Sequence, residues 1–294
     1  MIRSMTGYGQ ARQEGDGRSV VAEIRSVNGR YLKVASHVPN ELAAIERDLE
    51  KLVRRRVRRG SVDLYARVEF TGARAARPIN ADALRAYATA LLEATRELEA
   101  EVRLGVDALV ALPGVLEAEE LSEEDTEELA AAIAETVEAA LDGLDRMRQV
   151  EGAHLREELL GHAAAIERIV AAVEAGRDEA QQRYVQRLTE RVNRLLEGTD
   201  IAVGAQDLAR EVAIYAERSS VAEEIARLRS HVGQFRQALD RDEPVGRRLE
   251  FLAQEMHREV NTMGSKVADV GLSEAIVDLH GSVDKIREQA ANIE

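Results

Sequence analysis

The chain lacks residue types on which common metal-binding and nucleic-acid-binding sites depend. It has no cysteine, which excludes a disulfide framework and a thiolate metal site and is compatible with a reducing cytoplasm. It has no tryptophan, and aromatic residues make up only 3% of its 294 positions. We therefore expect no aromatic stacking surface for single-stranded nucleic acid of the kind found in RRM and OB folds.

Long apolar runs are also missing. No stretch approaches the roughly 20 residues that a membrane-spanning helix needs, and the opening MIRSMTGYG lacks the apolar core of a signal peptide. We expect a cytoplasmic protein with no membrane partner. Charge, in contrast, is abundant: 54 acidic residues against 40 basic ones give a net charge of −14. That sign is wrong on average for an RNA partner, so RNA binding would require basic segments gathered on one surface.

The N-terminal quarter of the chain has the pattern of a small α+β unit. Two runs rich in strand-forming residues, Ser19–Val27 and Arg30–His37, flank Asn28-Gly29. This dipeptide favours a type I′ turn, because both of its residues accept positive φ, and we predict a β-hairpin here. Ser61–Phe70 alternates apolar and polar residues and predicts another strand.

A basic helix lies between these strands. Apolar residues recur at helical spacing from Pro39 to about Arg58, and Gly60 ends the pattern. The end of this segment holds five arginines: Arg54, Arg55, Arg56, Arg58 and Arg59. One interpretation of this cluster is purely structural, because cations favour the negative end of a helix dipole. Five exceed what a helix end requires, so phosphate binding is an interpretation of equal standing.

From Asn80 the pattern is helical almost to the end of the chain. Ser122 followed by Asp125 is a helix-capping signature, and residues 152–197 keep the helical period with little interruption. So long a pattern predicts a coiled-coil or hairpin arm whose apolar seam needs a partner. The predicted domains are an α+β domain, a helical arm and a C-terminal helical bundle, at residues 1–77, 78–200 and 201–294.

The stretch Gly246–Gly271 carries the strongest chemical signal. Its apolar residues form one helical stripe: Leu249, Leu252, Met256, Val260, Met263 and Val267. Glu255, Glu259 and, further along, Lys266 form a row on the flank of that stripe. Carboxylates at the edge of a packed surface are partly desolvated, which suits them to bind a hard cation. Spacing alone leaves open an ordinary helix flank with Glu259 and Lys266 in solvent.

Long motifs at both ends of the chain carry a family resemblance. RSMTGYG and EIRSVNGRYL near the start, and LEFLAQEMHREVNTMGSK with a final KIREQAANIE, resemble the signatures of the YicC/YloC-like endoribonuclease family. Their order and spacing are similar as well, so the resemblance covers essentially the whole chain. Between about Pro78 and Asp200 it extends only to helical character. The segment VAEEIARLRSHVGQF also resembles the family pattern, which implies that the helix of Glu224 and His231 packs near that of Glu255.

The resemblance implies an RNA-cleaving enzyme that forms a homo-oligomer, a hexamer, around its RNA. Acidic residues dominate the candidate site, so we expect a metal-dependent route using Mg²⁺ or Mn²⁺. The predicted metal ligands are Glu255, Glu259, Glu224 and His231, and Lys266 completes the catalytic set. The predicted RNA-binding residues are Arg3, Arg25, Asn28, Arg30, Arg55, Arg56, Arg59 and Arg258.

Three alternatives remain open at this point. Cleavage could use the ribose 2′-hydroxyl with a general acid and base in place of a metal ion. The protein could bind RNA or act as a scaffold without cleaving, its acidic pairs being structural and its Arg-rich helix clamping the partner. It could also be a coiled-coil assembly protein with no affinity for RNA.

Overall fold

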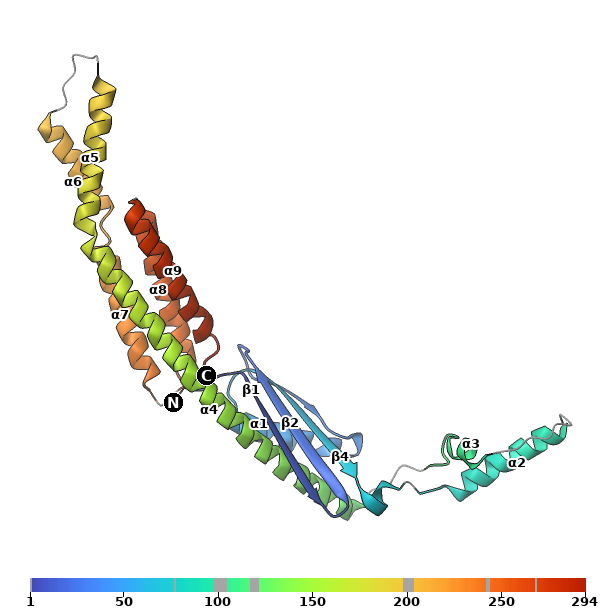
Figure 1. Ribbon diagram of the computed structural model, residues 1–294. Helices are drawn as coiled ribbons and strands as arrows, with labels where there is room; N and C mark the ends of the chain where they lie inside the picture. Colours follow the sequence, from blue (N-terminus) through green and yellow to red (C-terminus); the bar gives the residue numbers. More distant parts are fainter. Residues whose placement is uncertain are drawn as a thin grey trace.

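The protein is an elongated α+β molecule. Its computed structural model describes residues 2–76, 78–97, 105–116, 122–197, 204–241, 244–267 and 269–294. A small sheet lies near the middle, a helical bundle extends from it on one side, and a small helical arm projects from the other (Figure 1). The predicted class, an N-terminal sheet followed by a mostly helical region, is confirmed. No helix within the described ranges is both long and apolar enough to cross a membrane.

Four strands form the sheet, in the order β1-β2-β4-β3. They are β1 (Gly7–Gly15), β2 (Arg18–Val27), β3 (Lys33–His37) and β4 (Ser61–Phe70). The pairs β1–β2 and β2–β4 are antiparallel, whereas β3 runs parallel to β4. The one tight hairpin joins β1 to β2 through Asp16 and Gly17, whose φ angles of 51° and 68° are those of a type I′ turn.

The predicted hairpin at Asn28-Gly29 is wrong. Neither residue has positive φ, and β4 lies between β2 and β3 in the sheet. The chain crosses the end of β4 here, and Gly29 approaches Gly60 so closely that an added Cβ would lie 3.1 Å from its carbonyl carbon. A short connection and the sequence Asn-Gly fit a hairpin locally, but pairing with a strand thirty residues later decides the topology.

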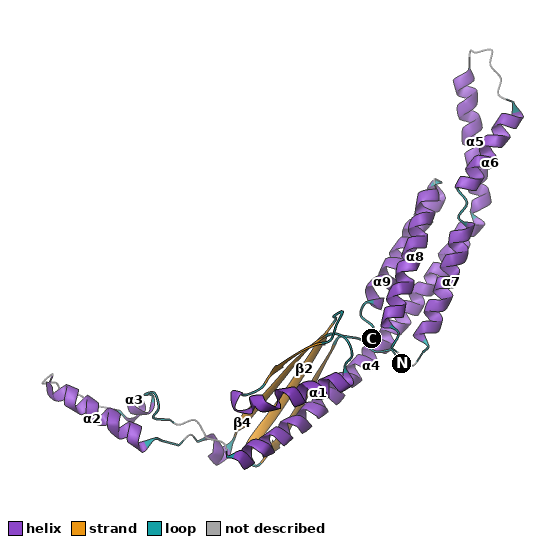
Figure 2. Cartoon of the chain, turned by 180° about the vertical axis from the view of Figure 1, so that it is seen from behind, coloured by secondary structure: helices purple, strands orange, loops and turns teal. Residues whose placement is uncertain are grey.

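Helices cover one face of this sheet. A 3-10 turn, η1 (Asn40–Ile45), leads into α1 (Glu46–Arg56), which lies across the sheet beside the long helix α4 (Glu123–Ala175), as Figure 2 shows. Contact between β1 and α4 is close enough to require glycine: a Cβ on Gly9 would lie 2.0 Å from the carbonyl oxygen of Ala140. The core between sheet and helices is apolar, with Ile24, Leu64 and Val137 fully buried.

Helix α4 is the continuous axis of the molecule. The predicted cap is confirmed, since the Ser122 hydroxyl accepts the backbone N–H of Asp125 at 3.0 Å. The helix continues without a break through Val150 to Ala175. It passes through Gly152, where a Cβ would lie 2.4 Å from the carbonyl oxygen of Ile2, so this glycine permits close packing of the N-terminal segment. Residues of α4 enter both hydrophobic cores.

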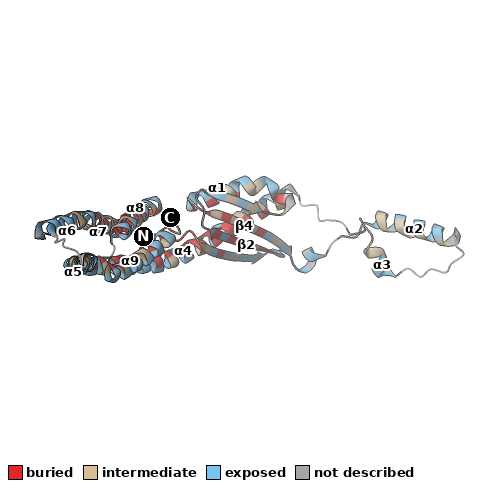
Figure 3. Cartoon of the chain, turned by 90° about the horizontal axis from the view of Figure 1, so that it is seen from above, coloured by how far each residue is buried: buried red, intermediate tan, exposed pale blue. Residues whose placement is uncertain are grey.

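The second core is a bundle of α4 with three C-terminal helices. These are α7 (Ala222–Leu239), α8 (Gly246–Lys266) and α9 (Val270–Ala290). Helix α8 packs against α7 and α9, and α4 packs against the same two helices from the other side. Residues coloured as buried concentrate in the bundle and in the sheet with the helices beside it (Figure 3). The apolar stripe predicted for α8 is buried in this core, from Leu249 to Met263.

Helical arms project from both ends of the molecule. Beyond the bundle, α5 (Arg177–Leu196) and α6 (Ala205–Arg218) form a hairpin arm, and residues 152–175 of the stretch predicted as an arm belong to α4. At the other end, η2 (Gly72–Ala75) leads to α2 (Ala81–Glu97) and the short α3 (Val106–Val110). Residue 77 and residues 198–203, where the two predicted domain boundaries fall, lie outside the described residues.

Candidate functional site

Helices α7 and α8 place the predicted acidic residues along their shared interface. The Lys266 ammonium of α8 donates to Glu224 of α7 at 2.6 Å. Seven residues earlier on α8, Glu259 lies 3.9 Å from the guanidinium of Arg227, three residues further along α7. The helices are therefore antiparallel, and continuing this register places Glu255 opposite His231. The two predicted segments thus meet, as the resemblance implied.

Glu224 is a buried carboxylate held by a lysine. Only 5% of the residue is exposed. Burial by itself raises the pKa of Glu224, but the hydrogen bond and charge of Lys266 and the charge of Arg227 more than offset it, so the pKa lies below its ordinary value. Lys266 also donates to the backbone carbonyl of Ser220 at 3.2 Å. The second oxygen of Glu224 is buried and has no hydrogen-bond partner among the residues that the structure describes.

Glu259 is the second buried carboxylate of this interface, with 5% of the residue exposed. Its position at the flank of the apolar stripe follows from helical spacing, whereas its burial comes from α7 packing over that flank. Arg227 bridges this acid and Glu223, and more than half of its guanidinium side chain stays exposed. Sequence reasoning missed Arg227, although its three-residue distance from Glu224 was a usable signal.

Glu255 and His231 complete the row at its more open end. The Glu255 side chain is 28% exposed, and its nearest cation is Arg258 at 4.0 Å, so it is only weakly paired. His231 is half-buried, and its Nδ1 atom is buried with no hydrogen-bond partner in the described part of the chain. His257 lies apart from this row: it contacts Asn261 on its own helix and Asp284 on α9.

These residues do not by themselves enclose a metal ion. In the part of the chain that the structure describes, no three His, Asp or Glu side chains gather closely enough to hold one. Glu224 and His231 lie about 10.5 Å apart along α7, and Glu224 already forms an ion pair with Lys266. Glu255 and Glu259 remain on adjacent turns, and their cationic partners, Arg258 and Arg227, are only loosely paired with them at 4.0 and 3.9 Å. Two carboxylates suit Mg²⁺, which takes most of its ligands from water and substrate phosphate.

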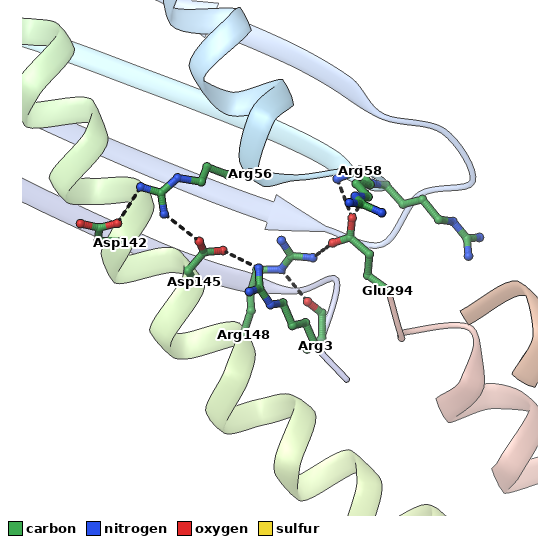
Figure 4. A network of polar contacts seen from close by, with 9 residues as sticks. Arg3, Arg56, Arg58, Asp142, Asp145, Arg148 and Glu294 are labelled. Carbon is green, nitrogen blue, oxygen red and sulfur yellow. Dashed lines mark hydrogen bonds and ion pairs between the residues drawn. The ribbon is translucent and has the colours of Figure 1, made fainter. Parts of the chain in front are cut away.

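Several predicted RNA-binding arginines instead join the sheet domain to α4 (Figure 4). Arg56 at the end of α1 contacts Asp142 at 3.0 Å and Asp145 at 3.2 Å, and Arg3 reaches Asp145 at 3.5 Å. Arg59 is mostly buried and contacts Glu250 on α8 at 3.0 Å. These side chains have acidic partners within the molecule, which the sequence gave no means of foreseeing.

A buried arginine lies at the centre of the contact between the sheet domain and the helical bundle, which is called the joint below. Arg148 of α4 is fully buried, donates to the Ser4 carbonyl at 2.6 Å and forms an ion pair with the side chain of Glu294. Glu294 also accepts the backbone N–H groups of Arg58 and Arg59, at 2.5 and 3.1 Å. One carboxylate thus ties the end of the chain to the Arg-rich segment and to α4. Sequence reasoning did not identify either Arg148 or Glu294.

The other predicted RNA-binding residues remain accessible. Arg25, Asn28, Arg30, Arg55 and Arg258 are exposed. Asn28 donates to Asn292 at 3.0 Å, which places it at the joint between the two cores. Arg59 meets α8 five residues before Glu255, about 7.5 Å away along the helix and more than a third of a turn around it. The basic N-terminal segment and the acidic row therefore meet the same helix on different sides.

Comparison with known proteins assigns the whole chain to one family. Residues 2–157 match a family described as endoribonuclease YicC-like, N-terminal region, and residues 173–294 match endoribonuclease YicC-like, C-terminal. The chain is 33% identical to a protein of Clostridioides difficile strain 630 and 28% identical to one of Haemophilus influenzae strain Rd, both named probable endoribonuclease YicC. Both alignments span 100% of each chain. The chain therefore belongs to the YicC-like endoribonuclease family.

Proposed function

We propose that the protein is a metal-dependent endoribonuclease that hydrolyses phosphodiester bonds in single-stranded or structured RNA and acts in cytoplasmic RNA turnover. Family membership supports cleavage of RNA. The observation that carries the assignment of the site is the row of carboxylates at the α7–α8 interface, two of them buried, with arginines and a lysine interleaved. Such a row can hold a cation and a phosphate side by side.

Within this row we assign the cation to Glu255 and Glu259. They are adjacent on one helix, Glu255 is partly exposed, and neither has a cation closer than 3.9 Å. A bound Mg²⁺ or Mn²⁺ would activate water and offset the charge that develops on the phosphate. Arg258 and Arg227, both with exposed side chains, are positioned to bind phosphate oxygens. These roles remain proposals for mutagenesis.

The pair Glu224–Lys266 has a different part in this proposal. Because Lys266 neutralises Glu224 at 2.6 Å, Glu224 holds the lysine in place and is not available to a cation at the same time. Lys266 then presents a fixed positive charge beside the row. His231, with Nδ1 free of any partner within the described residues, is the group best able to carry a proton near Glu255.

We further propose that the protein works as a homo-oligomer, with a hexamer as the form expected from the resemblance. The support is the pair of projecting arms, which leave apolar side chains in solvent. Leu92 on α2 and Val106 on α3 are 56% and 75% exposed, and Leu195 on α5 is 72% exposed. Exposed apolar residues on arms that contact little of their own chain are typical of surfaces that meet another subunit.

The test is cleavage of a labelled RNA by the purified protein. Incubation with single-stranded RNA in Mn²⁺ or Mg²⁺ should give shorter products, and none after dialysis against a chelator. Products that persist after complete metal removal would support the 2′-hydroxyl route instead. Salt-sensitive binding without products in any metal would favour a non-catalytic RNA-binding protein. Light scattering on the same sample gives the mass of the assembly.

A further inference from the structure

No helix of the described residues covers one face of the sheet. Helices α1 and α4 cover the opposite face, and alternate residues of all four strands point away from them. The register fixes the rows on this open face. One row across β1, β2 and β4 contains Tyr8, Arg25 and Asp63 as neighbours. The next row, across β2, β4 and β3, contains Glu23, Tyr65 and His37. Aromatic groups therefore recur on three of the four strands.

The rings of this face are exposed and already stacked in part. Tyr8 and Tyr65 are 37% and 40% exposed. The rings of Tyr65 and His37 lie 4.5 Å apart with an angle of 17° between their planes. This stack rises from two adjacent strands and has no core to pack against, because these strand positions face solvent. A third tyrosine, Tyr31, lies in the connection from β2 to β3 and is 63% exposed.

Guanidinium groups accompany the rings. The Arg25 guanidinium lies 5.7 Å from the centre of the Tyr8 ring, and that of Arg30 lies 5.5 Å from the Tyr31 ring. Both distances are within cation–π range. A tyrosine with an arginine over it offers two flat surfaces, a ring and a guanidinium, and an unpaired base can stack on either.

Charge is unevenly distributed along the open face. The half nearest the joint holds Arg25, Lys33 and the acidic Asp63, with Arg30 at the adjoining loop. Glu23 lies in this half too, but it is paired with Arg67 at 3.2 Å and lies 4.0 Å from Arg25. The half far from the joint carries Glu14 and Glu69 together with Arg12 and Arg67, and Arg12 is paired with Glu14 at 2.8 Å. The far half has as many acidic as basic residues, whereas Arg30 gives the near half an excess of one basic residue, so a polyanion is better accommodated where the tyrosines lie.

We propose that this half of the open sheet face binds single-stranded RNA by stacking unpaired bases on Tyr8, Tyr31 and Tyr65, with Arg25 and Arg30 on the phosphates or the bases. The proposal rests on the proposed function, for which it names the subsite that holds the RNA away from the cleavage residues. It also revises the expectation from composition, because three of the six tyrosines in the chain are exposed on or beside this face.

RNA fits this surface better than a protein partner does. A protein interface of stable affinity has an apolar centre, whereas here the side chains between the rings are charged or small, such as Arg25, Asp63 and Ala35. Rings separated by charged groups suit a ligand that alternates flat bases with phosphates. The joint end of the sheet, where Asn28 contacts Asn292, adjoins the bundle that holds Glu255. RNA leaving the sheet at this end would pass onto the bundle.

The test measures binding without cleavage. The full-length protein is titrated into a 3′-labelled, unstructured 12-nucleotide RNA in chelator, and anisotropy gives Kd. Tyr8→Ala and Tyr65→Ala should each weaken binding about fivefold or more, since a stacked base contributes roughly 1–3 kcal/mol. Tyr8→Phe and Tyr65→Phe keep the ring and should stay within about twofold of the parent. Duplex RNA of the same sequence should bind all five proteins alike, because its bases are already stacked.

Two results would overturn the inference. One is equal affinity of the alanine variants and the parent for the single strand. The other is loss of affinity together with a changed mass in light scattering, which would make this face a contact between copies of the chain. Circular dichroism confirms that each variant is folded, and the Tyr→Phe variants separate loss of the aromatic ring from loss of the hydroxyl group. A parent protein that binds RNA and never cuts it would refute the proposed cleavage while leaving this binding surface in place.

Discussion

Replacing Arg148 by methionine tests the joint between the two cores most sharply. Methionine keeps an unbranched apolar stem in place of the arginine side chain and removes its charge and all of its hydrogen bonds. Two partners then lose their donor: the Ser4 carbonyl, bonded at 2.6 Å, and the Glu294 carboxylate, which is 9% exposed. The first belongs to the N-terminal segment and the second to the end of the chain, so both segments should loosen from α4.

The size of the effect follows from what remains around Glu294. Breaking a buried ion pair by removing one partner costs about 3–5 kcal/mol, because the other charge stays buried. Glu294 keeps the backbone N–H groups of Arg58 and Arg59, which still stabilise its charge. We therefore expect the lower end, about 3 kcal/mol of unfolding free energy. Adding Glu294→Gln removes the unpaired charge and should recover part of this loss.

Urea unfolding at pH 7 measures the loss, and hydrogen exchange locates it. The amides of Ser4 and Met5 donate to the carbonyls of Arg148 and Asn292, so both should lose protection in the variant. Arg156→Met is the matched control, because Arg156 lies on the same helix and pairs with exposed Asp240. It should cost no more than about 1 kcal/mol. Equal losses in the two variants would refute the reasoning.

Two further predictions concern packing and pH. Gly9→Ala should lower the unfolding free energy measured in urea by about 3 kcal/mol or more, because its Cβ would lie 2.0 Å from the Ala140 carbonyl oxygen. Gly15→Ala, whose Cβ would meet open space, should change the unfolding free energy by no more than about 0.5 kcal/mol, and equal losses in the two variants would contradict the close approach. Burial raises the pKa of Glu224, but the hydrogen bond and charge of Lys266 outweigh it, so the pKa lies below its ordinary value of 4.5; Arg183 likewise lowers the pKa of Asp269 below 3.8. The stability that these two carboxylates contribute is therefore present above their ordinary pKa values and is lost as pH falls through the lower pKa values of the folded state. Unfolding free energy measured from pH 6 to pH 3 should fall less steeply in Asp269→Asn than in the parent, and an unchanged slope would refute that assignment.

Local patterns were enough to find most helices and the acidic row. The apolar stripe of α8 is the buried face of that helix, and Glu259 lies at its edge because helical spacing puts it there. The cap at Ser122 and the strand Ser61–Phe70 are likewise properties of neighbouring residues. Sequence could not say that α7 would close over Glu259 and leave Glu255 half-open, since that depends on how two helices meet.

The wrong hairpin prediction and the unpredicted ion pairs of the arginines share one physical cause. Both depend on partners far along the chain. Strand β2 pairs with β4 across a gap that no turn motif records, and Arg56 meets Asp145, which is 89 residues away. Arg148 and Glu294 are 146 residues apart. A run of arginines predicts affinity for anions in general. Only the fold decides whether the anion is a phosphate or a carboxylate of the same molecule.

The most direct measurement compares RNA cleavage by the parent with that by Glu255→Gln combined with Glu259→Gln. The account predicts that the cleavage rate in Mn²⁺ falls by at least about 100-fold, while helical circular dichroism and RNA affinity in chelator are unchanged. Glu288→Gln, an exposed change on α9, should cleave at the parent rate. Cleavage by the double variant at the parent rate would remove the active site from the α7–α8 interface.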